Sequence, residues 1–380
     1  MVVAGDPSGD ALAADLMLEL DKILDEPARF VGAGGPRMAA AGAALEFDLT
    51  QSAVIGLVFK KLPYFWRRAQ ELVRLAQKER PEVIVLVDFS WFNLWLGGAL
   101  RRAFGDDWRP KIVKYVSPQV WAYFPWRANL TARHADLLLC LYPFEKGWYA
   151  RRTPGLRVEC VGHPMFDKYG PVIPRPAGED HAIALLPGSR RGELLRHIPV
   201  IAEAARRIAS RMTVQFKMVL PSDEMAALAR SLLPRDGPII ELVAGQLEPI
   251  LRWASLAIAS TGTVTLECAY FGVPTVALYK TSWSTYLIGR QVVSVKYLAM
   301  PNILSGEPLL PEFIQGQATP TNIAEAALSL LGNTERRRCV QERLGQTMAE
   351  MGGPGASRRA ADAIAGLVES TGRIGEVGVG

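Results

Sequence analysis

Short apolar runs alternate with helical patterns along most of this chain, and this alternation limits the possible folds more than any other feature. The strand-like runs include PEVIVLVDF, KIVKYVS and ADLLLCLYPF in the first half, and HAIALLPGS, TVQFKMVLP and PTVALYK in the second. Stretches such as ADLMLELDKIL and ELLRHIPVIAEAARRIA lie between such runs and are typical of helices. Strands that alternate with helices in this way predict parallel, doubly wound α/β sheets.

A Pro/Gly-rich stretch, YGPVIPRPAGED at 169–180, interrupts the alternation and indicates a linker. With 380 residues, 49% of them hydrophobic, the chain is long enough for two domains. We expect two Rossmann-like domains at 1–168 and 181–340, followed by a C-terminal helical segment and flexible tail at 341–380. The first strand-like run, MVVA, is short, which is compatible with a start further upstream.

Three turns rich in small residues each connect a strand-like run to a helical one: AGDPSGD at 4–10, LPGSRRGE at 186–193 and STGTVTLE at 260–267. Such a turn directs backbone N–H groups and the positive end of a helix dipole toward one spot, which suits a diphosphate. Parallel sheets bind ligands beyond the carboxyl ends of their strands, so two domains that face each other bring these turns to one cleft. The turns therefore predict a cleft that binds a nucleotide.

Specific groups in these turns are the candidate ligand contacts. They belong to Asp6, Ser8, Gly9, Arg190, Ser260, Thr261, Gly262, Thr263 and Glu267. We expect the Arg190 guanidinium to bind a diphosphate, the N–H groups of 260–263 to form a second cradle, and Glu267 to accept hydrogen bonds from a ribose. The alternatives are a surface arginine beside a tight turn, and ordinary helix capping. Neither the GK[ST] of a Walker loop nor the dinucleotide motif GxGxxG is present.

The formal net charge of +5 indicates attraction to anionic partners. Basic and bulky aromatic residues are interleaved in FKKLPYFWRR at 59–68, a mixture that suits the headgroup region of a bilayer. No recognised nucleic-acid-binding motif appears, so we favour a membrane surface over nucleic acid. The candidate contacts are Lys60, Lys61, Tyr64, Trp66, Arg67 and Arg68. An ordinary solvated face is the alternative.

The four cysteines, Cys140, Cys160, Cys268 and Cys339, are far apart and include no CxxC pair, which is typical of reduced thiols in a cytoplasmic protein. The start, MVVAGD, lacks the basic region of a signal peptide. No uninterrupted apolar run approaches the about 18 residues of a membrane span. We therefore expect a cytoplasmic protein that contacts a membrane only from its surface.

Several segments together resemble the lipid-A-disaccharide synthases in order and spacing: AGDPSGD, FVGAGGPRM, YVSPQVWAY with PFEKGWY, GHP, LLPGSR, STGTVTLEC and PNILSGEPLLPEF. The most specific of them are YVSPQVWA and PNILSG, and the match extends to roughly residue 315. The resemblance implies the GT-B fold, in which two Rossmann-like domains face a cleft. The acceptor then binds to the first domain and a UDP-sugar to the second.

The resemblance also implies an inverting glycosyltransferase that needs neither a metal nor a cofactor. Such enzymes transfer 2,3-diacylglucosamine from UDP-2,3-diacylglucosamine to 2,3-diacylglucosamine 1-phosphate (lipid X). The products are lipid A disaccharide 1-phosphate and UDP, in lipopolysaccharide biosynthesis. The family further suggests a homodimer associated peripherally with the cytoplasmic face of the inner membrane. No DxD-like metal site stands out, and none of the four histidines forms a pair of HExxH type, which agrees with this mechanism.

Asp88 is the predicted catalytic base, because attack by a sugar hydroxyl requires removal of its proton. It follows the strand-like run PEVIVLV at the end where a catalytic group would face the cleft, and the family places an aspartate there. Capping of the next helix is the alternative role. By resemblance, Asn302 contacts the donor nucleotide, with a buried turn-capping role as the alternative. His163 lies by resemblance near the domain junction, where a core role is equally compatible.

Two positions depart from the family pattern. Trp91 stands where many members have a small or acidic residue, so acceptor or acyl-chain recognition is expected to differ. Asp6 replaces the usual Glu and is one methylene shorter.

Alternative functions are another UDP-sugar enzyme, such as a UDP-sugar 2-epimerase or a glycosyltransferase with a different acceptor, and a catalytically silent module that binds UDP-sugar or lipid. A soluble epimerase would need no apolar and basic surface.

Overall fold

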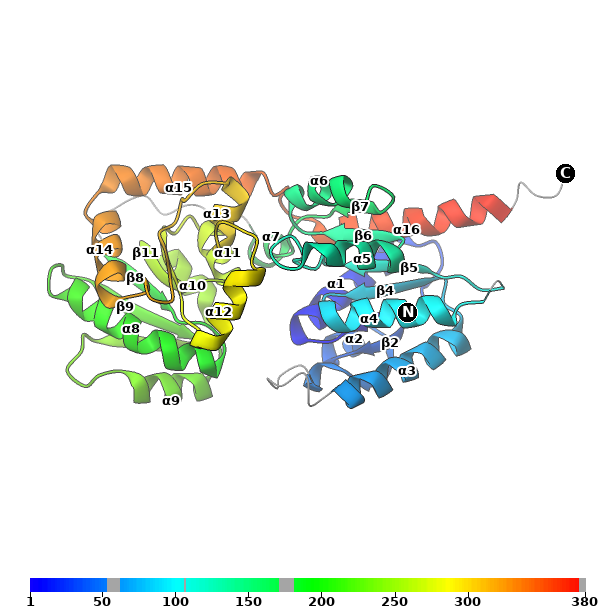
Figure 1. The fold of residues 1–380 in the computed structure, drawn as a ribbon, viewed down its shortest axis with the longest axis horizontal. Helices are drawn as coiled ribbons and strands as arrows, with labels where there is room; N and C mark the ends of the chain where they lie inside the picture. The colour runs from blue at the N-terminus through cyan, green and yellow to red at the C-terminus, as the bar shows by residue number, and fades with distance from the viewer. Residues whose placement is uncertain (53–61, 106, 171–180, 376–380) are drawn as a thin grey trace. The chain divides into compact units, whose positions relative to one another are not determined.

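The computed structural model describes residues 1–52, 62–105, 107–170 and 181–375, and it divides into two compact units. The first unit contains Met1–Lys168 and Gly353–Gly380, and the second contains Tyr169–Gly352. Each unit is built around one sheet with helices packed against it (Figure 1). All described strand pairs within the two sheets are parallel.

The sheet of the first unit has seven strands. In spatial order they are β3 (Ala44–Asp48), β2 (Val31–Gly34), β1 (Val2–Ala4), β4 (Val83–Val87), β5 (Lys111–Tyr115), β6 (Leu137–Cys140) and β7 (Arg157–Cys160). The chain runs outward from β1 to β3, then returns to place β4 on the other side of β1. The strand order therefore reverses between β1 and β4, which is the position where open α/β sheets bind ligands.

Among the described residues, helices and two short 3₁₀ turns complete the first unit. They are α1 (Pro7–Ile23), α2 (Pro36–Ala40), η1 (Thr50–Ser52), α3 (Leu62–Glu79), α4 (Ser90–Ala103), η3 (Pro125–Arg127), α5 (Ala128–His134), α6 (Pro143–Arg152), α7 (Met165–Tyr169), which ends at the first residue of the second unit, and α16 (Ala356–Gly375). α1 packs against α16, and α3 packs against α4. The core beneath α3 and α4 includes Phe65, Leu72, Phe92 and Leu96, all buried.

The sheet of the second unit has six strands, with the order reversing between β8 and β11. In spatial order the strands are β10 (Ile240–Ala244), β9 (Gln215–Leu220), β8 (Ala182–Leu186), β11 (Leu256–Ser260), β12 (Thr275–Tyr279) and β13 (Glu312–Ile314). The helices are α8 (Arg191–Ala209), α9 (Asp223–Leu232), α10 (Leu247–Trp253), α11 (Thr263–Tyr270), α12 (Trp283–Val292), α13 (Met300–Ser305), α14 (Pro320–Leu331) and α15 (Thr334–Ala349).

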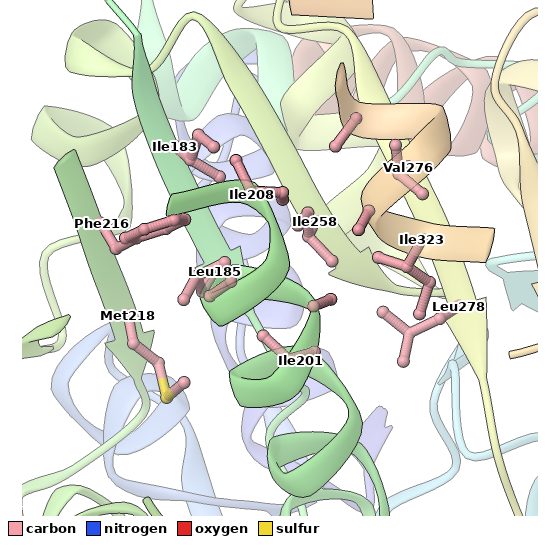
Figure 2. Packing of buried hydrophobic residues seen from close by; sticks show 14 of the residues in the cluster. Ile183, Leu185, Ile201, Ile208, Phe216, Met218, Ile258, Val276, Leu278 and Ile323 are labelled. Atoms are coloured by element: carbon pink, nitrogen blue, oxygen red, sulfur yellow. The ribbon is translucent and has the colours of Figure 1, made fainter. Parts of the chain in front are cut away.

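The central strands of the second unit are apolar and fully buried, as expected for parallel strands covered on both faces. Figure 2 shows Ile201 and Ile208 of α8 against Ile183 and Leu185 of β8. Truncating one such side chain to Ala costs about 2–5 kcal/mol, because the cavity left behind refills only partly. This core fixes the first turn of α8 beside the carboxyl end of β8.

The C-terminal segment is divided between the two units, whereas the sequence led us to expect one separate segment at 341–380. α15 belongs to the second unit, but α16 packs on α1 of the first. Arg359 donates to the carbonyl of Val161 (2.8 Å), and Asp167 accepts from the N–H of Ala356 (3.0 Å). These contacts are distant in sequence, so no local pattern reveals them. Of the expected linker, residues 171–180 lie outside the described part.

Candidate active site

The first unit brings two predicted acidic residues to the switch point of its sheet. Ala4 is the register partner of Val87, so the turn after β1 and the turn after β4 are neighbours. Asp6 lies in the former turn and Asp88 in the latter. A Cβ atom built on Gly9 would lie 3.7 Å from the Cβ atom of Asp88, which places the start of α1 directly against it.

Asp6 caps α1. Its carboxylate accepts a hydrogen bond from the N–H of Gly9 (2.7 Å), and Ser8 is exposed beside it. A short acidic side chain fits this capping geometry. Asp10, which the sequence did not single out, is buried and accepts from three N–H groups of the turn after β2, those of Gly35, Arg37 and Met38. It ties that turn to α1.

Asp88 is held in an unusual backbone conformation. Its φ angle is 42°, in the left-handed region that costs about 1 kcal/mol or more for a residue with a Cβ. The buried side chain of Asn93 secures this turn by donating to the carbonyls of Val87 and Asp88, both at 2.9 Å. Lys114 of β5 also donates to the Asp88 carbonyl. The surroundings therefore impose a strained backbone conformation on this turn, and none of these three hydrogen bonds involves the Asp88 carboxyl group.

Burial raises the pKa of the Asp88 carboxyl, while the charge of Lys114 opposes the rise and that of Asp6 adds to it. Burial also lowers the pKa of the Lys114 ammonium to about 8, against the pull of both aspartates. Such perturbed groups in a turn at a ligand edge are typical of proton-transfer sites. Lys114 was not singled out as a site residue, and its one local sign is that it lies within the otherwise mostly apolar strand-like run KIVKYVS.

Trp91 and His163 both make contacts that support the fold: Trp91 packs against other aromatic rings, and His163 hydrogen-bonds to the backbone. The Trp91 ring packs edge-on against Phe65, with 4.9 Å between centroids, and tilted against Phe89 at 5.6 Å. Trp91 therefore helps join α4 to α3. Burial lowers the pKa of His163 to about 4, so its ring is neutral near pH 7. Its Nδ1 accepts a hydrogen bond from the N–H of Met165 at 3.2 Å.

The second unit brings two of the predicted turns together, because Leu186 and Ala259 are register partners in β8 and β11. In the turn after β8, two N–H groups are already hydrogen-bonded to a nearby side chain. The Glu193 carboxylate accepts from the N–H groups of Ser189 (3.0 Å) and Arg190 (3.3 Å). We expected these donors to be open, but Glu193 of the LPGSRRGE segment caps the helix instead. The Arg190 side chain is 84% exposed and pairs only loosely with Glu193, at 3.3 Å.

The turn after β11 keeps part of its N–H groups open. The N–H of Thr261, which we expected in the cradle, instead donates to the carbonyl of Leu278 (3.0 Å), because β11 pairs with β12. No described residue accepts a hydrogen bond from the N–H groups of Gly262, Thr263 or Val264 at the start of α11. Gly262 has φ 143°, a conformation that favours glycine. Ser260 is buried, whereas Gly262 and Thr263 are exposed. Together these groups form an anion-binding geometry.

Glu267 lies one turn further along α11, and its carboxylate accepts a hydrogen bond from the hydroxyl of Tyr169. Tyr169 is the first residue of the second unit, so this contact lies within that unit. Tyr270, on the same helix, donates to the carbonyl of Gly170. The start of the second unit is therefore fastened to α11, close to the residue that we expected to contact a ribose.

His197 connects the turn after β8 to the end of β12. The N–H of Lys280 donates to Nε2 of His197 (3.0 Å), so the ring proton resides on Nδ1, which donates to the carbonyl of Pro187 (2.7 Å). The Lys280 ammonium in turn donates to the carbonyls of Gln315 (3.0 Å) and Ala318 (3.3 Å). This network braces three strand ends beside the predicted diphosphate site.

Asn302 is fully buried in α13. Its amide donates to the carbonyl of Leu310 (2.9 Å) and to Glu312 (2.7 Å), and its Oδ1 accepts from the N–H of Leu310 (2.8 Å). Glu312 also accepts from the N–H groups of Leu298 and Ala299. The side chain thus clamps the loop between α13 and β13, as in the turn-capping alternative.

Four of the predicted membrane contacts, Tyr64, Trp66, Arg67 and Arg68, lie at the start of α3. Lys60 and Lys61 fall outside the described residues. Trp66 is 53% exposed and Arg67 is also exposed. Arg68 instead pairs with Glu71 (2.6 Å) and lies over the rings of Phe47 and Tyr64.

A groove of about 410 Å³ lies beside Trp66, between α3 and α4. Val73, Arg74, Trp95 and Arg102 also line it. The sequence analysis had not singled out Trp95. None of the described helices combines the length and the apolar character that crossing a bilayer requires. Likewise, no cluster of three His, Cys, Asp or Glu side chains suited to a metal ion occurs among the described residues.

Comparison with known proteins identifies the family. A family model described as lipid-A-disaccharide synthetase matches residues 1–366. The lipid-A-disaccharide synthase of Syntrophus aciditrophicus is 34% identical over 378 residues, which cover 95% of each chain. That of Solibacter usitatus is 33% identical over 380 residues, covering 97% of each chain. The chain belongs to the lipid-A-disaccharide synthetase family. The resemblance found in the sequence motifs is therefore confirmed.

Solved structures similar to this family member confirm the predicted GT-B fold class. MurG of Acinetobacter baumannii superposes with a TM-score of 0.58 at 15% identity, covering 96% of this chain and 98% of that chain. The UDP-GlcNAc 2-epimerase of Neisseria meningitidis gives 0.57 at 11% identity, covering 97% and 98%. At such low identity these similarities concern the fold, and they do not favour the epimerase alternative.

Proposed function

We propose that this member of the lipid-A-disaccharide synthetase family transfers 2,3-diacylglucosamine from UDP-2,3-diacylglucosamine to 2,3-diacylglucosamine 1-phosphate. The products are lipid A disaccharide 1-phosphate and UDP. The first unit binds the acceptor and the second binds the UDP-sugar. Family membership over residues 1–366 supports the reaction. The division of roles is supported by the different groups at the two sheet edges: a buried aspartate and lysine in the first unit, and open N–H groups in the second.

The observation that carries the mechanism is the carboxyl of Asp88 at the switch point of the first sheet. The acceptor hydroxyl attacks the anomeric carbon of the donor, and its proton moves to the Asp88 carboxylate. The bond between that carbon and the phosphate oxygen breaks, and UDP leaves with the electron pair. A pKa raised by burial makes the carboxylate a stronger base than an exposed aspartate.

The donor diphosphate binds at the open N–H groups that begin α11, with the Arg190 guanidinium completing the site. Arg190 gives up little when it leaves Glu193, because an exposed ion pair contributes only about 0–1 kcal/mol. We propose that Asp6, Ser8 and Gly9 contact the acceptor. The remaining donor contacts are Ser260, Thr261, Gly262, Thr263 and Glu267. Asn302, expected as a donor contact, supports this site indirectly by holding the loop before β13 in place.

The direct test is to incubate the purified protein with UDP-2,3-diacylglucosamine and lipid X, without added metal. UDP release and the lipid product are followed, the latter by mass spectrometry. We expect a disaccharide 1-phosphate in equal amount to UDP. UDP binding without disaccharide, over several acyl-chain lengths, would contradict the proposed reaction and favour a different acceptor or a silent binding module.

The start of α3 contacts an anionic membrane surface in this proposal, with the protein on the cytoplasmic face of the inner membrane. The exposed Trp66 and Arg67 and the groove lined by Trp95 support this contact, since acylated substrates are drawn from a bilayer. The double variant Trp66→Ala/Arg67→Ala should sediment less with anionic vesicles than the wild type does. Undiminished sedimentation would count against this surface.

The family resemblance also leads us to propose a homodimer. Light scattering on the full chain tests this assembly. A mass near twice 41.6 kDa is expected, and a monomer over a range of concentrations would contradict it.

A further inference from the structure

α12 stands apart from the other helices of the molecule. Among the described helices of eight or more residues, it alone buries no side chain. Its apolar residues are exposed instead: Trp283 by 64%, Leu287 by 58% and Ile288 by 64%. Val293, just after the helix, is also exposed. A cluster of large apolar side chains on the surface marks an interaction site.

The charged residues of the segment that contains α12 have a single sign. Between Glu267 and Glu307 the sequence contains no acidic residue, whereas Lys280, Arg290 and Lys296 are basic. Two of these cations lie against aromatic rings, Arg290 over Tyr286 at 5.9 Å and Lys296 over Tyr297 at 5.0 Å. Aromatic rings and cations surrounding exposed aliphatic side chains are typical of segments that lie in a bilayer interface.

Several of these residues share a face, and Ile288 lies next to it. Trp283, Leu287 and Arg290 follow the spacing of one helical face, and Tyr286 adjoins it, with its ring 5.8 Å from that of Trp283. The helix begins shortly after β12, in the unit whose neighbouring strands β8 and β11 end at the predicted diphosphate site. Its polar residues are uncharged apart from Arg290. The surface therefore offers apolar and cationic groups to a partner, with no acidic group in the segment to oppose an anion.

We infer that α12 and the segment up to Lys296 form a second membrane-contacting surface, which docks onto an anionic lipid bilayer. This inference rests on the proposed membrane association and extends it from the first unit to the second. Each unit would then have its own lipid-facing element, α3 in one and α12 in the other. The exposed Leu287 and Ile288 enter the interface, while Arg290 and Lys296 bind lipid phosphates.

Vesicle sedimentation of the full chain tests this surface. The variant Leu287→Ser/Ile288→Ser removes two exposed apolar side chains from α12. The matched control, Leu18→Ser/Ile239→Ser, removes two exposed apolar side chains elsewhere, one in each unit. Because none of these four residues is buried, melting temperatures should stay close to that of the wild type.

We expect Leu287→Ser/Ile288→Ser to weaken binding to phosphatidylglycerol vesicles about tenfold, with the control variant unchanged. Arg290→Gln/Lys296→Gln should weaken binding to these vesicles by a similar factor but leave binding to pure phosphatidylcholine unaltered. Light scattering in parallel reports the oligomeric state of every variant.

The outcomes separate the proposals. If the wild type sediments with anionic vesicles and the α12 variant sediments equally well, the α12 surface is overturned while membrane association through α3 stands. If light scattering instead shows that the α12 variant is a monomer while the wild type is a dimer, the α12 surface is covered by a second copy of the chain. A wild type that binds no vesicle overturns both membrane surfaces.

Discussion

The ligand edge of the first sheet and that of the second share a topology but differ in chemistry. Both lie where the strand order of a doubly wound sheet reverses. In the first unit the edge holds a buried lysine beside a strained aspartate, and burial shifts both pKa values. In the second unit the edge holds exposed N–H groups and an arginine that is 84% exposed.

In the proposed function, this difference lets one topology serve two tasks. Burial removes charged groups from water and so shifts their pKa values. A general base needs such a shift, because it works best when its pKa is near the pH of the reaction. Open N–H groups and an exposed guanidinium at helix starts bind an anion without changing protonation. Variants of the first edge should therefore alter turnover, and variants of the second should alter donor affinity.

The largest effect is expected for Asp88→Asn. The amide cannot accept the acceptor's proton, so kcat should fall by about 10²–10⁴-fold. UDP affinity, measured by calorimetry, should stay within about twofold of the wild type, since the donor site is in the other unit. A variant with wild-type turnover would remove Asp88 from the mechanism.

Arg190→Ala should weaken UDP binding about tenfold or more, because a charge-assisted hydrogen bond to a phosphate is worth about 1.5–3 kcal/mol. Calorimetric titration with UDP measures this loss. Arg206→Ala, on the same helix but paired with Glu203, serves as the control and should bind UDP as the wild type does. Equal UDP affinities for Arg190→Ala and the wild type would exclude the proposed contact.

Lys114→Met should change the pH dependence of the reaction. The ammonium lowers the pKa of Asp88, so its removal raises that pKa, and the acidic limb of the kcat/KM profile should move to higher pH. Lys111→Met on the same strand is the control. An unshifted profile would mean that the two groups are not coupled. In the wild type this coupling should fade above pH 8, because the pKa of Lys114 is about 8.

The smallest effect is expected for Glu193→Gln. Removing a negative charge beside the diphosphate site, while keeping a side chain that can cap α8, should tighten UDP binding by about twofold to threefold. This expected change in UDP affinity is opposite in sign to that of Arg190→Ala. Weaker UDP binding would show that Glu193 helps to order the turn for the donor.

Local patterns in the sequence were sufficient for the sheets and for most residues at their edges. The runs ending at Asp88 and Ser260 are apolar enough to be central strands, and the residues that follow such strands necessarily lie at the ligand edge. The turn after β1 could be placed for the same reason. These predictions depend on strand direction, which the alternation of strands and helices determines.

The remaining features depend on contacts between segments far apart in the sequence. Lys114 approaches Asp88 only because β5 pairs with β4, and Asn302 is buried only because the loop before β13 folds over it. The return of α16 to α1 is of the same kind. Glu193 is the exception, since its place three residues after Arg190 is a local capping pattern that the sequence analysis missed.

The most direct test of the division between the edges is a titration of UDP into the double variant Asp88→Asn/Lys114→Met. This variant removes the charges of Asp88 and Lys114 from the first edge and leaves the second edge untouched. We predict that it binds UDP with wild-type affinity although it forms no measurable disaccharide. A loss of UDP affinity as large as that of Arg190→Ala would contradict the account, because the first edge would then also bind the donor.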